Sequence, residues 1–343
     1  MKIFKVDAGH YYTDGGAMMG VNPWALWGKK EPTDERRRIR LALDLLLIVG
    51  HGRVILVDTG IGNRLSEKQI KIYKPSEYIL EKSLAALGYQ ASDVTDVILS
   101  HLHFDHAGGL ITSHEGEDKI TFANARLWCQ KAEWEMAKNP DGLNQAAYDY
   151  PNQLQALEEK MQERDGVAVA SDHTGCQEEK IQVRDGVAVA SDHTGSDSQL
   201  QRSCPHPCSS VEKSFASHDL DLQAEHAHLG NQRSDSQLTT HNSQLELTLV
   251  DGDAEIAPGV KVKKTGGHSV GSQIVEIEAQ DGFYIYPADI IPTAFHLPLA
   301  ITSAYDVNRK ETYLAKQYIH QTIKERGGKL LLNHDNVHWV FRC

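Results

Sequence analysis

The chain has 343 residues, with 35 Lys and Arg against 47 Asp and Glu, so its formal net charge is −12. Hydrophobic residues make up 40% and charged residues 24%, which is ordinary for a globular protein. The acidic balance, without a stripe of Lys and Arg, argues against a nucleic-acid partner, because phosphate groups are neutralised by cationic side chains. No apolar run approaches the roughly 20 residues that span a bilayer, and the first residues lack the apolar stretch of a secretion signal. We therefore expect a cytoplasmic protein without a membrane partner, whose five cysteines are reduced thiols.

Patterns typical of strands and helices alternate along the chain. In chain order, the predicted elements are a strand at 53–58, a helix at 76–87, a strand at 96–100, a strand at 283–286, a helix at 310–326 and a strand at 329–332. The first of these two helices is expected to begin with Ser76 as its N-cap and to stop at Gly88. This alternation predicts an α/β protein.

The composition changes between residues 152 and 244. This stretch is poor in large apolar residues and rich in acidic ones, and Glu158–Gly175 recurs in it as Glu178–Gly195. Such a segment buries too little apolar surface to offset the entropy lost on ordering it. We therefore predict one domain formed by residues 1–151 and 245–343, interrupted at 152–244 by a low-complexity, disordered insertion.

The strongest chemical signal is a run of histidines and an aspartate directly after the predicted strand at 96–100. His101 and His103 are two residues apart, so at a strand end they can reach one ion from the same side. Asp105 and His106 lie past the bend and can reach a second ion. Imidazole and carboxylate ligands suit Zn²⁺, and also Mn²⁺, Fe²⁺ or Co²⁺. The run therefore predicts a metal site.

This run resembles the metal-binding signature of the metallo-β-lactamase superfamily, whose fold is an αβ/βα sandwich. Four further segments resemble the superfamily's other motifs in the expected order: Val57-Asp-Thr-Gly60, Gly266-Gly-His-Ser-Val-Gly271, Pro287-Ala-Asp289 and Asn333-His-Asp335. The resemblance implies two divalent metal ions per chain, with zinc expected first. The implied ligands are His101, His103 and His268 for one ion, Asp105, His106 and His334 for the other, and Asp289 shared between them. Asp58 matches no ligand position, and we expect it to orient a ligand by a hydrogen bond.

The segment from Asp14 to Trp27 resembles the opening of the YtnP-like branch of quorum-quenching lactonases. The resemblance implies that this loop helps to form the pocket for an acyl chain. The candidate pocket residues are Met18, Met19, Trp24, Trp27 and His296. Some homoserine lactonases have a Tyr three residues after the shared Asp, where it assists the substrate carbonyl. That position is Pro292 here, so this assistance is absent or comes from elsewhere, with His296 and Tyr305 as candidates.

The resemblance implies a dinuclear hydrolase that opens the lactone ring of N-acyl-homoserine lactones. A hydroxide that bridges two ions roughly 3.5–4 Å apart would attack the lactone carbonyl, and Asp105 would carry a proton to the leaving group. Two alternatives stay open: the same site acting on a phosphotriester, another ester or a thioester, or a non-catalytic metal-binding protein whose histidine-rich insertion binds the metal. The expected partner is a small lactone or ester, with a homodimer as one option for assembly.

Overall fold

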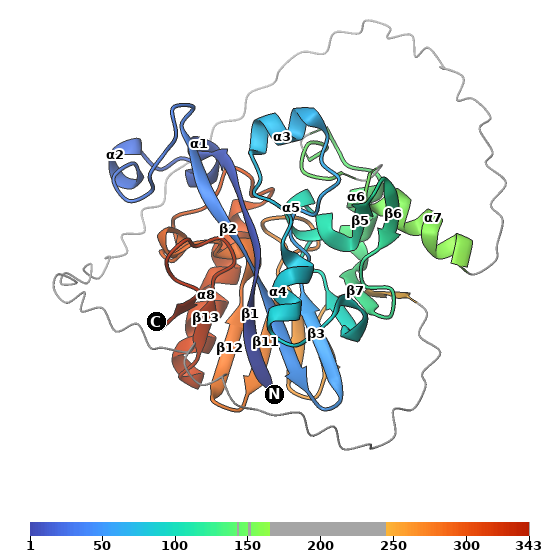
Figure 1. Ribbon diagram of the computed structural model, residues 1–343. Helices are drawn as coiled ribbons and strands as arrows, with labels where there is room; N and C mark the ends of the chain where they lie inside the picture. The colour runs from blue at the N-terminus through green and yellow to red at the C-terminus, as the bar shows by residue number, and fades with distance from the viewer. Residues whose placement is uncertain (143, 150–151, 165–244, 343) are drawn as a thin grey trace, which may run out of the picture. The chain divides into compact units, whose positions relative to one another are not determined.

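Two six-stranded sheets form the centre of the structure (Figure 1). The computed structural model describes residues 1–142, 144–149, 152–164 and 245–342. The first sheet contains, in spatial order, β1 (Lys2–Asp14), β2 (Arg38–Gly50), β3 (Arg53–Val57), β4 (Asp96–Ile98), β7 (Arg126–Gln130) and β8 (Glu246–Val250). The second contains β14 (Val340–Phe341), β13 (Lys329–Leu331), β12 (Gly282–Tyr286), β11 (Gln273–Ala279), β10 (Val260–Lys264) and β9 (Ala254–Ala257). A separate hairpin is formed by β5 (Ile111–His114) and β6 (Glu117–Ile120).

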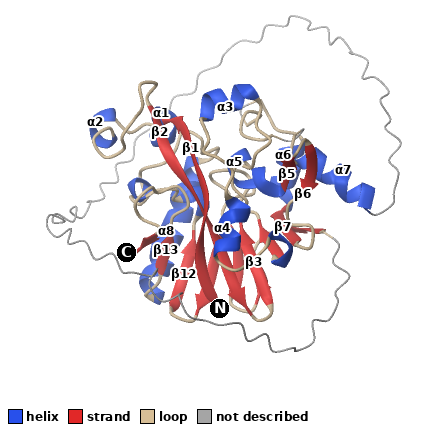
Figure 2. Ribbon diagram, in the orientation of Figure 1, coloured by secondary structure: helices blue, strands red, loops and turns tan. Residues whose placement is uncertain are grey.

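Helices flank the strands of both sheets (Figure 2). The α-helices are α1 (Gly15–Met19), α2 (Trp24–Trp27), α3 (Glu67–Tyr73), α4 (Leu80–Ala86), α5 (Phe104–Ala107), α6 (Lys131–Lys138), α7 (Leu154–Arg164) and α8 (Arg309–Arg326). Short 3₁₀ helices are η1 (Ala91–Asp93), η2 (Gly108–Leu110), η3 (Ala288–Ile290) and η4 (Ala294–His296). Among the described residues, no helix is both long and apolar enough to cross a membrane.

Three clusters of apolar side chains hold these layers together. The cluster between the two sheets contains Ile48 of β2 and Val275 of β11. A second cluster packs Leu84 of α4 against the outer face of the first sheet, and a third packs Ile319 of α8 against the outer face of the second. Because β2 is buried on both faces, its sequence is an almost continuous apolar run rather than an alternating one. The αβ/βα sandwich expected from the sequence is confirmed.

Parallel strand pairing brings the chemistry-bearing residues to the same edge. β3, β4, β7 and β8 run parallel in the first sheet, and β12 and β13 run parallel in the second. Asp58 directly follows β3, and His101 follows β4 by three residues. In the second sheet, Asp289 follows β12 and His334 follows β13, each by three residues. Asp58 and Ala288 have φ angles of +62° and +45°, so the chain turns through a strained, left-handed conformation at both strand ends.

One predicted helix is shorter than expected. α4 begins at Leu80, with Ile79 and not Ser76 at the N-cap position. Ser76 instead pairs with β1, because its N–H donates to the carbonyl of His10 at 2.8 Å and its Oγ accepts from the N–H of His10 at 3.0 Å. The hydroxyl that a cap would need is thus used in a tertiary contact. The other predicted elements are confirmed as β3, β4, β12, α8 and β13, with ends shifted by at most two residues.

The ordered domain continues beyond residue 151, where the sequence predicted the insertion to begin. Residues Leu154–Arg164 form α7, and Leu154 and Leu157 are buried in the cluster on the outer face of the first sheet. These leucines are three positions apart and therefore lie on one face of the helix. The remainder of the predicted insertion, residues 165–244, lies outside the described residues. β7 and β8 pair directly, so the segments before and after it share one sheet.

Candidate metal centre

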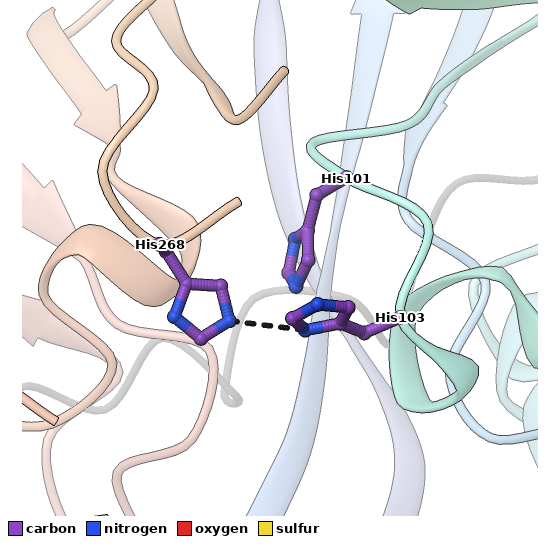
Figure 3. Close-up of side chains that lie close together, drawn as sticks. All are labelled: His101, His103 and His268. Atoms are coloured by element: carbon purple, nitrogen blue, oxygen red, sulfur yellow. Dashed lines mark hydrogen bonds between the residues drawn. The ribbon is translucent and has the colours of Figure 1, made fainter. Parts of the chain in front are cut away.

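Three histidines from two separate loops face one another at the carboxyl ends of the strands (Figure 3). His101 and His103 follow β4, and His268 lies between β10 and β11. His268 Nε2 lies 3.1 Å from His103 Nδ1, and the three candidate ligand atoms are all within 4.8 Å of one another. All three side chains are buried. We call these residues the first ligand group.

Four more candidates form the second ligand group: Asp105, His106, Asp289 and His334. Nε2 of His106 lies 3.2 Å from Nε2 of His334, and Oδ1 of Asp289 lies 3.2 Å from each of these nitrogens. The other carboxylate oxygen of Asp289, Oδ2, lies 3.4 Å from Nε2 of His268. Asp289 thus faces both groups, and the structure brings together all seven residues that the sequence analysis named as ligands.

The residues present fit divalent metal ions. Nε2 of His101 and Nε2 of His103 are buried and have no hydrogen-bond partner among the described residues. An unpaired buried polar atom costs about 1–3 kcal/mol, and a bound cation is one way to satisfy such nitrogens. Imidazole nitrogens and carboxylate oxygens are also the ligands that zinc and related ions prefer.

Four of the five histidines in the two ligand groups make a contact at Nδ1 that orients the ring. The contacts are His101 Nδ1 with Ser100 Oγ at 3.0 Å, His106 Nδ1 with Asp58 Oδ2 at 2.9 Å, His268 Nδ1 with Asp306 Oδ1 at 2.9 Å and His334 Nδ1 with the carbonyl of Ala42 at 2.7 Å. Such contacts fix the tautomer and orientation of a ligand ring. Asp58 also accepts from the N–H and hydroxyl of Ser100, each at 2.7 Å, and is fully buried. It makes the kind of hydrogen bond that the sequence analysis expected of it.

The electrostatics of the cluster favour a cation in its midst. Burial, together with the neighbouring histidines, lowers the pKa of His101 and of His103, which favours the neutral form of both rings. Burial alone would raise the pKa of Asp289, but neighbouring histidines hold it well below its usual range. Burial alone would lower the pKa of His106, but nearby carboxylates, led by Asp289, raise it well above its usual value. A metal ion bound by such a histidine replaces its proton, so metal binding here would release protons.

Sequence reasoning missed a buried carboxylate, Glu133 of α6. Its Oε1 accepts from the N–H of Leu102 at 3.0 Å and the hydroxyl of Tyr148 at 2.9 Å. Its Oε2 accepts from Ser269 Oγ at 2.6 Å and the N–H of Gly271 at 2.9 Å. Glu133 therefore ties together the two loops that carry the first ligand group. Nothing in the local sequence of α6 distinguishes it, and the same holds for Asp306, because these contacts are long-range.

The candidate pocket residues differ in exposure and in the contacts that they make. Met18, Met19 and Trp27 are buried in the core cluster on the outer face of the first sheet, whereas Trp24 is 44% exposed. Both ring nitrogens of His296 are bonded within the protein, to Thr293 Oγ1 at 2.8 Å and the carbonyl of Met18 at 3.0 Å. A cavity of about 720 Å³ is lined by none of these five residues and by none of the seven candidate ligands. The acyl-chain pocket stays a prediction.

Part of the chain matches a known protein family. Residues 44–179 match the model of the metallo-β-lactamase superfamily. Two curated relatives, the probable metallo-hydrolases Mb2322c of Mycobacterium bovis and Rv2300c of Mycobacterium tuberculosis, are each 32% identical over 97 residues. That match covers 26% of this chain and 31% of each relative, so the chain spans about a third of their length.

Several solved structures share the fold of this chain. A probable metal-dependent hydrolase from Staphylococcus aureus is 23% identical with a TM-score of 0.69, over 99% of this chain and 91% of that one. AidC, a dizinc quorum-quenching lactonase, is 15% identical with a TM-score of 0.60, over 98% of this chain and 88% of that one. An N-acyl homoserine lactone hydrolase is 16% identical with a TM-score of 0.56, over 98% and 93% of the two chains. At these identities the likeness concerns the fold.

Proposed function

We propose that this chain is a dinuclear metal-dependent hydrolase that opens the lactone ring of N-acyl-homoserine lactones. The observation that carries the proposal is the pair of ligand groups joined by Asp289, whose two oxygens lie 3.2 Å and 3.4 Å from histidines of different groups. A carboxylate between two sets of imidazoles is suited to two ions held close together. Zinc is the ion proposed first, because imidazole and carboxylate ligands suit it.

The choice of a lactone rests on two further observations. The segment from Asp14 to Trp27 resembles the opening loop of quorum-quenching lactonases. In addition, AidC and an N-acyl homoserine lactone hydrolase share the fold over nearly the whole chain. A cytoplasmic location and a small lactone or ester as partner are part of the same proposal.

In this proposal the chain's own residues have distinct roles. The first ligand group would hold one ion and the second group the other, with Asp289 contacting both. When bound, such ions acidify a water molecule toward neutral pH and polarise a carbonyl. Asp105 would take up a proton at a carboxylate oxygen and pass it to the alkoxide released when the ring C–O bond breaks. Asp58 would keep the His106 ring in place through the hydrogen bond at Nδ1.

The test is pH-stat hydrolysis of a long-chain N-acyl-homoserine lactone by matched zinc-loaded and chelator-treated protein. We expect acid release that depends on zinc and returns when zinc is restored. Zinc bound at two equivalents without lactone turnover would reject the lactone and direct the search to phosphotriesters, other esters and thioesters. A chain that binds no zinc would reject the metal centre itself.

A further inference from the structure

A phenol from the N-terminal strand reaches the second ligand group. The hydroxyl of Tyr11 lies 2.6 Å from Oδ2 of Asp105, although 94 residues separate them in the chain. In this contact the phenol O–H donates and the carboxylate oxygen accepts. Tyr11 is 5% exposed and Asp105 6% exposed, so water competes little for this contact.

The ring of Tyr11 is held on several sides. Its centroid lies 6.2 Å from that of Phe104, 6.3 Å from that of Tyr73 and 5.9 Å from that of His334, each in an edge-to-face arrangement. Edge-to-face packing at such distances is a favourable geometry for aromatic pairs. The position of the hydroxyl is therefore set by packing around the ring and does not depend on the hydrogen bond alone.

The contact ends on the carboxylate oxygen that faces the other ligands. Oδ2 of Asp105 lies 3.5 Å from Nε2 of His334 and 3.7 Å from Nε2 of His106. A carboxylate oxygen has two lone-pair sites, so a bond from Tyr11 at one site leaves the other for an ion. The phenol thus restricts rotation of the Asp105 side chain while its ligand capacity is kept.

The strand pair β1–β2 also contacts a second ligand of this group. The carbonyl of Ala42 on β2 pairs with Nδ1 of His334, and the N–H of Ala42 donates to the carbonyl of His334 at 3.2 Å. Tyr11 and Ala42 lie on the neighbouring strands β1 and β2, where Tyr11 is opposite Leu41. The β1–β2 strand pair therefore contacts the second ligand group at two residues, Asp105 and His334.

We propose that Tyr11 is a positioning residue that orients Asp105 in the second ligand group and thereby strengthens binding of the ion held there. The proposal rests on the proposed function in one respect, that this group binds a metal ion. It does not depend on the identity of the substrate.

The test is a zinc titration of the metal-free, full-length chain against a competing chelator, without substrate. Tyr11→Phe keeps the ring and removes only the donor. We expect one of the two zinc ions to bind about 10-fold more weakly or worse in Tyr11→Phe, which is the usual effect of losing a partner that orients a ligand. Tyr73→Phe is the matched control, because Tyr73 belongs to the same ring cluster but is not a hydrogen-bond donor to Asp105, and it should titrate like wild type. Thermal unfolding shows whether each variant is folded.

A double-mutant cycle shows whether Tyr11 acts through Asp105. Asp105→Asn should weaken the same zinc ion, and adding Tyr11→Phe to it should then change the affinity by less than about 2-fold, because the charged acceptor is gone. Equal zinc affinities in wild type and Tyr11→Phe would overturn the proposal, as would a full effect of Tyr11→Phe in the Asp105→Asn background. Two zinc ions bound with no lactone hydrolysis would reject only the proposed substrate. A wild type that binds no zinc would reject the proposed function and the role of Tyr11 together.

Discussion

Nδ1 of His103 lies 3.1 Å from Nε2 of His268, although 165 residues separate these histidines in the chain. The first stands in the loop after β4 of one sheet and the second in the loop between β10 and β11 of the other. Their meeting depends on the packing of the two sheets and on Glu133, which is hydrogen-bonded to both loops. The candidate metal centre is thus a product of the sandwich as a whole.

His103→Ala removes one of the three imidazoles in the first ligand group. We expect the zinc content of the purified chain to fall from two equivalents to about one or below, and lactone hydrolysis to fall below detection, because an ion held by fewer protein ligands binds far more weakly. Metal analysis and pH-stat hydrolysis measure the two effects. His338→Ala is the control, since His338 is exposed and belongs to neither ligand group. Turnover near the wild-type rate in His103→Ala would contradict the dinuclear mechanism.

Asp58→Asn weakens the hydrogen bonding that orients the ring of His106. Asp58 is fully buried and accepts from His106, from Ser100 and from the hydroxyl of Tyr286, the last at 3.1 Å. An amide accepts at only one of its two atoms, so at least one donor loses its partner. We expect zinc affinity to fall about 10- to 100-fold, as is usual when a partner of a ligand histidine is changed. Competitive chelator titration is the measurement, and an unchanged affinity would show that His106 is oriented by other contacts.

Glu133→Gln tests the connection between the two histidine loops. The amide nitrogen of Gln would face N–H or O–H donors where a carboxylate oxygen now accepts two hydrogen bonds. We expect the free energy of unfolding to fall by about 1–3 kcal/mol, measured by urea denaturation of the metal-free chain. Glu135→Gln on the same helix is the control, because Glu135 is exposed and should change stability by less than about 0.5 kcal/mol. Equal losses in the two variants would indicate that α6 merely tolerates glutamine poorly.

Lys316 makes the stability of the chain depend on pH above neutrality. Its side chain is fully buried, and Nζ donates to the carbonyls of Pro298 at 2.7 Å and Ile301 at 2.6 Å. Burial lowers the pKa of Lys316 to about 8, although the carboxylate of Asp306 acts in the opposite direction. In the unfolded chain the pKa is about 10.4, so between these two values the unfolded chain binds more protons and stability rises with pH. This contribution amounts to about 3 kcal/mol and is complete above about pH 10.4.

Lys316→Met removes the group that titrates. We expect the difference in unfolding free energy between wild type and Lys316→Met to be constant below pH 8, and to shift in favour of wild type between about pH 8 and pH 10. Urea denaturation at a series of pH values measures this difference. Lys324→Met on the exposed side of the same helix is the control and should leave the slope unchanged. A difference that does not vary with pH would show that Lys316 titrates normally.

Short-range patterns in the sequence were enough to predict a large part of this structure. The buried strand at 96–100 and the spacing of His101, His103, Asp105 and His106 identified the metal-binding loop without any tertiary information. Short apolar runs likewise predicted β12 and β13, and a helix was predicted where α8 lies. Resemblance to family motifs added His268, Asp289 and His334, which single-residue reasoning could not have selected, because each stands in an ordinary turn or strand end.

The tertiary structure decided the contacts that no local pattern encodes. Ser76 has the chemistry of a helix cap, yet β1 lies beside it and takes its hydroxyl into a hydrogen bond with His10. Tyr11, Glu133 and Asp306 touch the ligand loops only because strand order and sheet packing bring distant segments together. A hydrogen bond needs a donor and an acceptor about 3 Å apart in suitable geometry. When the two residues are far apart in the chain, the local sequence around either one does not indicate its partner. The sequence by itself therefore determined which residue types could bind metal, and packing determined which residues hold them in place.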